Sequence, residues 1–314
     1  MNLLESTRVK LRNFISRHEV MALRLFRGFI CLMGLLSVRT CFYEGSVLDN
    51  RFLILVVTVV GGFVPFSATT LIIIFSALIH IASLSRQVAI ALSLLLVFIY
   101  LLSFYYNSDD RFYAVLSPIF YQMRIPFAVP MAAGLFGKVN DVVPVMGGSI
   151  VGFYLRLVIE NKALLKDPAS NIDAFSLMLD QMVRNQLFYC YVAANIAMFL
   201  IVYFVRKKIV VHASEIGVSF GALASFVIML TANLFFNSGE NIAQFVVEII
   251  VTWVLGLFVS YFFVEADYSR PETLQFEDDE YYYYVTAIPK IHITKEEWKV
   301  KRITGNDLGK DEEK

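Results

Sequence analysis

The chain has 314 residues, of which 58% are hydrophobic and 17% are charged. A soluble domain is closer to half apolar and a quarter charged, so this composition excludes an ordinary water-soluble protein and indicates an integral membrane protein. Lysine plus arginine and aspartate plus glutamate both number 27, so net charge gives no sign of a nucleic-acid partner. The three cysteines show no CxxC or metal-finger spacing, and neither a disulfide framework nor a metal site is expected.

The segment 1–18 is basic, and its apolar residues Leu4, Leu11 and Phe14 fall on one face at helical spacing. Such a pattern is typical of an amphipathic helix lying on the cytoplasmic membrane surface. A solvated turn that leads into the first span fits the same residues.

The region 19–265 is predicted to form the transmembrane domain, because apolar segments of membrane-spanning length recur along it. Residues 160–186 are its longest hydrophilic stretch, and their apolar periodicity favours a surface helix. Uninterrupted spans are expected over residues 21–38, 88–106, 142–159, 187–205, 216–236 and 242–264.

The apolar segment 52–83 is too long for one ideal span. Gly61, Gly62 and Pro65 are predicted to divide it into a short and a longer piece, because proline removes a helix donor and glycine weakens a helix.

A second interrupted segment, 112–137, contains Pro118, Pro126 and Pro130, with Arg124 near its middle. Non-helical backbone survives at membrane depth only where protein buries it or where it lines a water-filled cavity. An arginine at that depth is costly and needs a partner. The segment therefore predicts a broken membrane helix that contributes to a polar site.

The two interrupted segments share a pattern in which a polar turn leads to an apolar–proline–phenylalanine triplet, 64–66 and 125–127. Matched interruptions of this kind point to a transporter-type repeat, although apolar segments also resemble each other by chance. If each interrupted segment crosses once, the chain has about eight spans, and both termini lie on one side whether the segments cross or re-enter. The basic cluster 206–208 and the basic N-terminus place that side in the cytoplasm.

The tail 266–304 changes character, with an acidic run at 277–280 and four tyrosines at 281–284. Tyrosine and β-branched residues favour strands, so two or three short strands are expected, too few to be stable alone. Residues 305–314 are charged and predicted to be disordered. The candidates for docking a protein partner or a second copy of the chain are Glu277, Asp278, Asp279, Tyr281, Tyr282, Tyr283, Tyr284, Pro289 and Lys290.

Two charged residues of the spans carry the functional expectations. Arg124 either binds an anionic substrate group or forms a structural pair with a neighbouring acid. Glu248, in the middle of the last span, either relays protons, pairs with a cation or stays protonated and hydrogen-bonded. The full set of substrate or cavity candidates is Arg124, Pro126, Pro130, Pro118, Gly61, Gly62, Pro65 and Glu248.

Motifs for catalysis are not found. The sequence has no HExxH, no GxSxG and no G-x-x-x-x-G-K-[ST]. We therefore expect a protein that is not an enzyme and that needs no cofactor.

A resemblance is carried by residues 125–127, 130, 134–135, 267–270, 275–285, 287, 289–290 and 300–303. These residues resemble an uncharacterised multipass membrane protein family of clostridial Firmicutes whose members are commonly labelled "ABC transporter permease". The resemblance implies a bacterial plasma-membrane protein. An EAA-type loop for an ATPase is not seen between 206 and 214, and the sequence has no P-loop, so a permease of this sequence would take its energy from a partner or an ion gradient.

These observations predict an all-α polytopic membrane protein with about eight transmembrane helices, two of them broken by proline or glycine, and a short β-rich cytoplasmic tail. The first functional expectation is a transport-type membrane subunit with a polar site at the broken helices. The alternative is a non-catalytic membrane scaffold or assembly factor that recruits partners through its tail.

Overall fold

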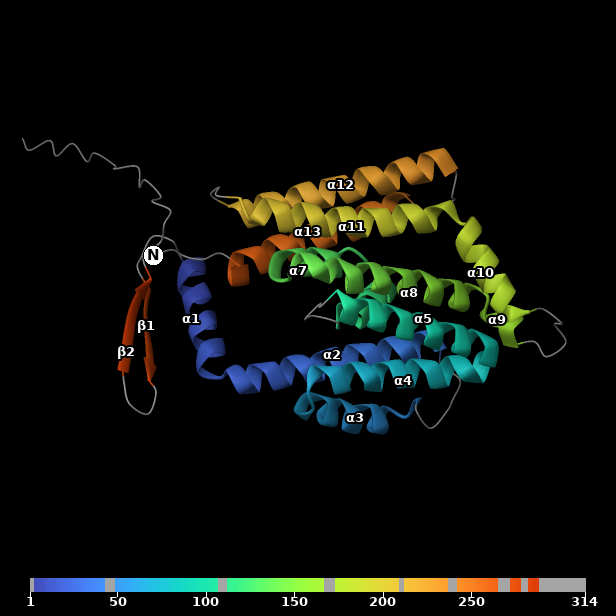
Figure 1. The fold of residues 1–314 in the computed structure, drawn as a ribbon, viewed down its shortest axis with the longest axis horizontal. Coiled ribbons are helices and arrows are strands. Elements are labelled where there is room, and N and C mark those ends of the chain that lie inside the picture. Colours follow the sequence, from blue (N-terminus) through green and yellow to red (C-terminus); the bar gives the residue numbers. More distant parts are fainter. Residues whose placement is uncertain are drawn as a thin grey trace, which may run out of the picture. The chain divides into compact units, whose positions relative to one another are not determined.

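The computed structural model describes residues 3–42, 49–106, 112–166, 173–208, 212–236, 242–264, 272–277 and 282–287. The chain divides into two compact units, Met1–Glu265 and Ala266–Lys314. In the first unit every described element is a helix (Figure 1).

The helices of the first unit follow one another with short connections. They are α1 (Leu3–Arg17), α2 (Glu19–Phe42), α3 (Arg51–Phe63), α4 (Phe66–Leu84), α5 (Arg86–Tyr105), α6 (Tyr113–Gln122), α7 (Ala128–Phe136), η2 (Val139–Asp141), α8 (Val142–Glu160), α9 (Lys162–Lys166), α10 (Ala174–Arg184), α11 (Gln186–Arg206), α12 (Ala213–Phe236), α13 (Ile242–Val259) and η3 (Ser260–Val264).

Among the described residues, seven helices are long and apolar enough to cross a membrane by length and composition. They are α2, α4, α5, α8 with η2, α11, α12 and α13 with η3. The six uninterrupted spans expected from the sequence each correspond to one of these helices, and α10 occupies the predicted surface region. The number falls below the expected eight because segment 112–137 contributes no helix long enough to cross, whereas segment 52–83 contributes α4. The shorter apolar helix α3 returns the chain between α2 and α4, so the two ends of the first unit can lie at the same end of the bundle.

The segment 52–83 forms a hairpin rather than one broken span. Helix α3 returns along α2, so that a Cβ on Gly62 would lie 3.7 Å from Gly28 Cα. The chain then turns at Pro65, and α4 alone is long enough to cross. Polar side chains donate hydrogen bonds to carbonyls near the turn. Thr69 Oγ1 donates to Gly61 O at 2.9 Å, and Arg27 Nη1 donates to Val64 O at 3.3 Å. The break therefore lies where the sequence predicted it.

The segment 112–137 forms a second hairpin, α6–α7. At 10 and 9 residues, each helix is about 14–15 Å long, roughly half of the hydrocarbon core. Asn140, shortly after α7, donates to the carbonyl of Tyr106, at the end of α5, with a distance of 2.8 Å. Both ends of the hairpin thus lie at the same end of the bundle. The segment re-enters, which resolves the alternative that the sequence left open.

Pro126 lies at the break between α6 and α7, but the expectation that Pro118 and Pro130 also interrupt the segment is wrong. Pro118 lies inside α6, and Pro130 lies in the first turn of α7, where a missing N–H costs little. The absent N–H of Pro118 deprives Ala114 O of its usual helical donor. Gly148 of α8 packs against this carbonyl, and a Cβ at Gly148 would lie only 2.9 Å from it.

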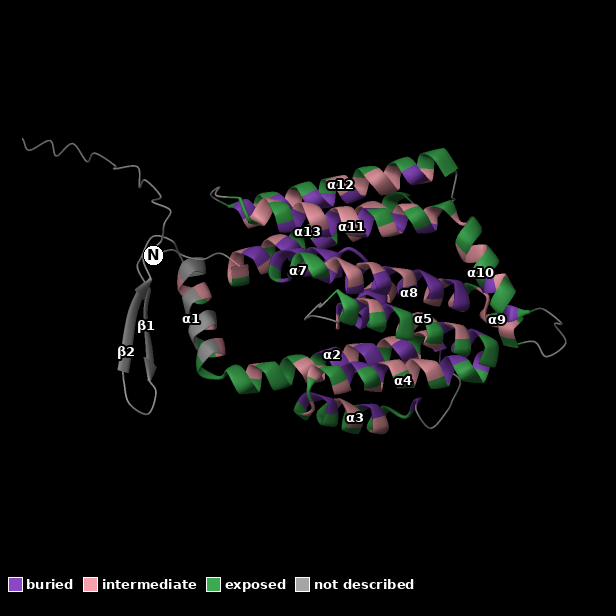
Figure 2. Cartoon of the chain, in the orientation of Figure 1, coloured by how far each residue is buried: buried purple, intermediate pink, exposed green. Residues whose placement is uncertain are grey.

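The α6–α7 hairpin is enclosed by protein. Residues 113–119 of α6 are all buried, as are most residues of α7 and α8 (Figure 2). Helix α8 covers α6, and α11 covers α7 through a close approach at Gly134, whose Cβ would lie 3.0 Å from Phe199 O. The other long helices expose large apolar side chains such as Leu94 and Phe235, as expected for surfaces that face lipid. Burial of the hairpin meets the requirement that irregular backbone at membrane depth be shielded.

Arg206, the last residue of α11, holds the end of α7. Its guanidinium donates to the carbonyls of Leu135 and Gly137, which the helix end leaves without helical donors. Replacing Arg206 by Met removes both bonds, and we expect it to lower the free energy of unfolding by about 2–3 kcal/mol. Thermal unfolding of the detergent-purified variant measures this loss. Lys208→Met, an exposed cation two residues away, is the control and should unfold like the wild type.

The two ends of the first unit lie at one end of the bundle. The Arg8 guanidinium of α1 lies over the ring of Tyr261 in η3, 5.4 Å from its centroid. The opposite end contains the start of α5 and helix α10, which are joined by a 3.0 Å bond from the Ala174 N–H to Gln87 Oε1. We call these the terminal end and the α10 end.

In the second unit, β1 (Glu272–Glu277) pairs antiparallel with β2 (Tyr282–Ala287). The register pairs Glu272 with Ala287 and Glu277 with Tyr282. Residues 288–314 lie outside the described part of the chain, so a tail of two or three strands stays a prediction.

Candidate functional site

The break between α6 and α7 is a helix C-terminus with a specific geometry. The Arg124 N–H donates to Tyr121 O at 3.1 Å, and the Ile125 N–H donates to Phe120 O at 3.0 Å. These two hydrogen bonds together form a Schellman motif. The residue at the turn of this motif is left-handed and is most often glycine. Here it is Arg124, with φ of 65°. A non-glycine residue in this conformation stores strain, and such strain gathers at functional sites.

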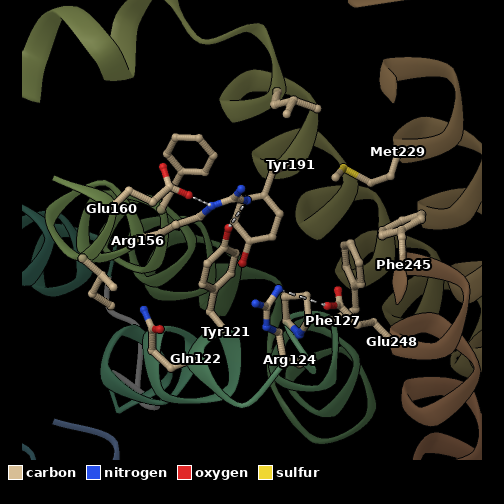
Figure 3. A pocket seen from close by; sticks show the side chains of 14 residues that line it. Tyr121, Gln122, Arg124, Phe127, Arg156, Glu160, Tyr191, Met229, Phe245 and Glu248 are labelled. Atoms are coloured by element: carbon tan, nitrogen blue, oxygen red, sulfur yellow. Dashed lines mark hydrogen bonds and ion pairs between the residues drawn. The ribbon is translucent and has the colours of Figure 1, made fainter. Parts of the chain in front are cut away.

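The break opens into a cavity of about 300 Å³ (Figure 3). Five helices (α6, α8, α11, α12 and α13) and the break contribute to its wall, so residues far apart in the sequence meet there. Its lining combines four charged residues with aromatic rings. The lining residues are Tyr121, Gln122, Arg124, Pro126, Phe127, Phe153, Arg156, Ile159, Glu160, Leu187, Tyr191, Met229, Phe245 and Glu248.

Two arginine–glutamate pairs face the cavity, and they differ in strength. Arg156 Nε donates to Glu160 Oε1 at 2.7 Å, and Arg156 Nη1 donates to the hydroxyl of Tyr121 at 3.1 Å. Arg124 Nη1 lies 4.0 Å from Glu248 Oε1, at the outer limit for an ion pair. The Arg124 side chain is 71% exposed, whereas that of Glu248 is 14% exposed. The first pair is closed and the second is open.

Small residues of α8 place the closed pair. Gly148, Gly152 and Arg156 follow one another at intervals of four residues and therefore lie on one helix face. A Cβ at Gly152 would lie 3.3 Å from Pro118 Cα and 3.3 Å from Tyr121 Cβ. The two glycines let α6 approach α8, as small residues at four-residue spacing do in membrane helix pairs. This approach brings the Tyr121 hydroxyl to Arg156.

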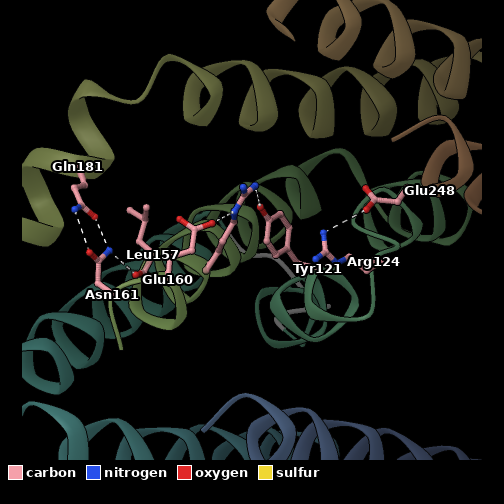
Figure 4. A network of polar contacts seen from close by, with 8 residues as sticks. Tyr121, Arg124, Leu157, Glu160, Asn161, Gln181 and Glu248 are labelled. Carbon is pink, nitrogen blue, oxygen red and sulfur yellow. Dashed lines mark hydrogen bonds and ion pairs between the residues drawn. The ribbon is translucent and has the colours of Figure 1, made fainter. Parts of the chain in front are cut away.

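A polar track connects the cavity to the α10 end (Figure 4). A second hollow shares Glu160 and Leu187 with the cavity and extends to Gln181, Arg184 and Asn185. At its far end, the side chains of Asn161 and Gln181 exchange hydrogen bonds of 2.7 and 3.3 Å. The track extends the cavity as a hydrophilic path toward this end of the bundle.

Of the candidates named from the sequence, the structure brings Arg124, Pro126 and Glu248 together at the cavity. Pro118 and Pro130 are buried in α6 and α7 and do not line it. Arg124 has a glutamate neighbour, in agreement with the requirement that an arginine at this depth be paired.

Gly61, Gly62 and Pro65 lie elsewhere, at the α3–α4 turn against α2. A Cβ at Gly61 would lie 2.7 Å from Cys31 Sγ, so this glycine allows close helix packing. These three residues position the first hairpin and take no part in the cavity.

The docking candidates of the tail are partly described. Glu277 ends β1, and Tyr282, Tyr283 and Tyr284 begin β2. Asp278, Asp279, Tyr281, Pro289 and Lys290 lie outside the described residues. No group of three or more potential metal-ligating side chains occurs in the part of the chain that the structure describes.

Sequence reasoning missed most of the cavity wall, and above all the closed pair. The signal was present as the four-residue spacing of Gly148, Gly152 and Arg156, which marks a helix-packing face that ends in a charge. The partner residues carry no comparable local signal. The missed residues with polar side chains are Tyr121, Gln122, Arg156, Glu160 and Tyr191.

Comparison of the chain with known protein families, curated proteins and solved structures finds no match.

Proposed function

We propose that this protein is a transport-type multipass subunit of a bacterial plasma membrane that takes a polar solute at the α6–α7 break. The observation that carries the proposal is a left-handed, exposed Arg124 at the tip of a buried re-entrant hairpin, facing a charged cavity. Membrane transporters commonly place their substrate sites at discontinuous helices near the middle of the bilayer. A purely structural arginine would be expected to have a close, well-shielded partner.

The path from the cavity leads to the α10 end, and the cationic N-terminal helix and Arg206 to Lys208 lie at the terminal end. The positive-inside rule favours the terminal end as cytoplasmic. We therefore propose that the cavity opens to the outer face and that both ends of the first unit face the cytoplasm.

Water access to the cavity tests the proposal. In a variant with Cys31, Cys41 and Cys190 replaced by Ser, we expect Arg124→Cys to react with a membrane-impermeant methanethiosulfonate added to intact cells. The reaction needs a hydrated thiolate, which a water-filled cavity open to the outside supplies. Mass spectrometry of the purified protein measures the modified fraction.

The control places a cysteine at Leu94, which is 63% exposed on α5, on a lipid-facing surface of the same domain. This thiol should stay unmodified because lipid cannot support the thiolate. Equal labelling of both positions, or no labelling at 124 from either side of the membrane, would contradict a hydrated transport site.

The scaffold alternative is supported by the hairpin of β1 and β2. A two-stranded sheet is at best marginally stable alone and offers unpaired edges to another chain. If the tail recruits a partner by strand pairing, deletion of residues 266–314 should remove proteins that co-purify with the full chain while the first unit stays folded. Crosslinking in native membranes followed by mass spectrometry measures this, and an unchanged set of crosslinked proteins would count against the scaffold.

A further inference from the structure

We infer that the cavity binds a zwitterion, a small molecule with one acidic group and one amine or quaternary ammonium group. The acidic group lies on Arg124 and the cationic group lies on Glu248. The inference rests on the proposed polar site and specifies its substrate class.

The charges of the cavity balance. Its lining contains two arginines, Arg124 and Arg156, and two glutamates, Glu160 and Glu248. A ligand with net charge would leave one of these groups uncompensated at membrane depth, which is expensive. A ligand that carries both signs inserts without changing the balance.

The open pair is the one that a ligand can enter. Arg156 already donates to Glu160 and to the hydroxyl of Tyr121, so separating this pair would cost two charge-assisted hydrogen bonds. The 4.0 Å separation of Arg124 and Glu248 contributes little by itself, because Arg124 is largely exposed. Glu248 is held in place by Gln244 Nε2, which donates to Oε1 at 2.9 Å. Opening the second pair therefore costs less than opening the first.

The surroundings of the open pair match the two ends of a zwitterion. Gln122, which lines the same cavity, has a buried Nε2 without a hydrogen-bond partner, and this donor suits a carboxylate or phosphate oxygen. Phe127 and Phe245 lie beside Glu248, with ring centroids 6.2 Å apart (Figure 3). Aromatic rings next to a carboxylate favour an ammonium group.

The volume limits the size. A cavity of about 300 Å³ is at the lower end of small-molecule sites, which suits an amino acid or a lipid headgroup. A free zwitterion would arrive through the polar track, whereas a headgroup would arrive from the surrounding bilayer. Both sources present the same two groups to Arg124 and Glu248.

Calorimetric titration of the full chain in nanodiscs made only of phosphatidylglycerol tests the inference, because that lipid brings no zwitterionic headgroup. The probes are L-alanine and glycerophosphoethanolamine as zwitterions, acetate as an anion and ethylammonium as a cation. We expect one zwitterion to bind at least about tenfold more tightly than acetate or ethylammonium, since each single-charge probe forgoes a charge-assisted bond. Tighter binding of L-alanine assigns a free solute, and tighter binding of glycerophosphoethanolamine assigns a headgroup.

Two single variants and one double variant sharpen the test. Arg124→Gln and Glu248→Gln should each lower the affinity for the preferred zwitterion by about tenfold. The double variant carries no unbalanced charge, so it should fold like the wild type and still lose the preference for zwitterions. The exposed charges Arg51 and Glu19 supply the matched controls Arg51→Gln and Glu19→Gln, which should bind as the wild type does.

Acetate or ethylammonium binding as tightly as both zwitterions would overturn the inference, and so would binding of no probe. Neither result touches the proposed function, which falls if the thiol at position 124 is not labelled, or is labelled no more than the thiol at position 94. The two claims therefore fail separately.

Discussion

Arg124→Gly is expected to leave the fold intact while it removes ligand binding. Glycine adopts the left-handed conformation without strain, so the free energy of unfolding should change by no more than about 1 kcal/mol. The loss of the guanidinium should lower the affinity for L-alanine, or for glycerophosphoethanolamine if that is the better probe, by about tenfold or more. Thermal unfolding and calorimetric titration of the same preparation measure the two effects.

The matched variant is Arg124→Val. A β-branched residue bears the cost of the left-handed turn that glycine avoids, so this protein should lose binding and be about 1–2 kcal/mol less stable than Arg124→Gly. If Arg124→Gly unfolds as readily as Arg124→Val, the arginine has a structural role that its side chain performs. If Arg124→Gly binds the probes like the wild type, the guanidinium is not part of the site.

Gly148→Ala is expected to destabilise the bundle, because the added methyl group would press on the backbone of a neighbouring helix. The new Cβ would lie 2.7 Å from Ser117 Cβ and 2.9 Å from Ala114 O, and the second of these is backbone that cannot move aside alone. Helices α6 and α8 must separate, which should cost about 1–3 kcal/mol and pull Tyr121 away from Arg156. Thermal unfolding measures the first effect, and altered probe binding reports the second.

Gly28→Ala on α2 is the control for this change. The nearest atoms to a Cβ at Gly28 are 3.7 Å away, an ordinary contact, so the alanine should be tolerated and its better helix propensity should help slightly. Equal stability of the two alanine variants would mean that α6 and α8 do not pack as closely as the 2.9 Å distance between a Cβ at Gly148 and Ala114 O indicates.

The residues near each turn already determined where the chain breaks. Pro65 lies between the end of α3 and the start of α4, shortly after Gly61 and Gly62, and Pro126 lies between α6 and α7. These are local effects, because a missing N–H or Cβ acts within one turn of helix. The same reasoning wrongly predicted a helix break at Pro118. The local pattern does not show that Gly148, on another helix, packs against the carbonyl of Ala114, which this proline leaves without a donor.

The composition and apolar periodicity of the sequence by themselves determined that this is a helical protein of membrane class, with an arginine at depth that needs a partner. Only the tertiary structure decided that both interrupted segments turn back as hairpins, that Arg124 faces Glu248, and that Arg156 closes on Glu160 and Tyr121. The physical reason is the distance along the chain over which each interaction acts. Backbone hydrogen bonding and hydrophobicity are set by neighbours along the chain, whereas the partner of a buried charge depends on which helix faces can pack closely enough to reach it.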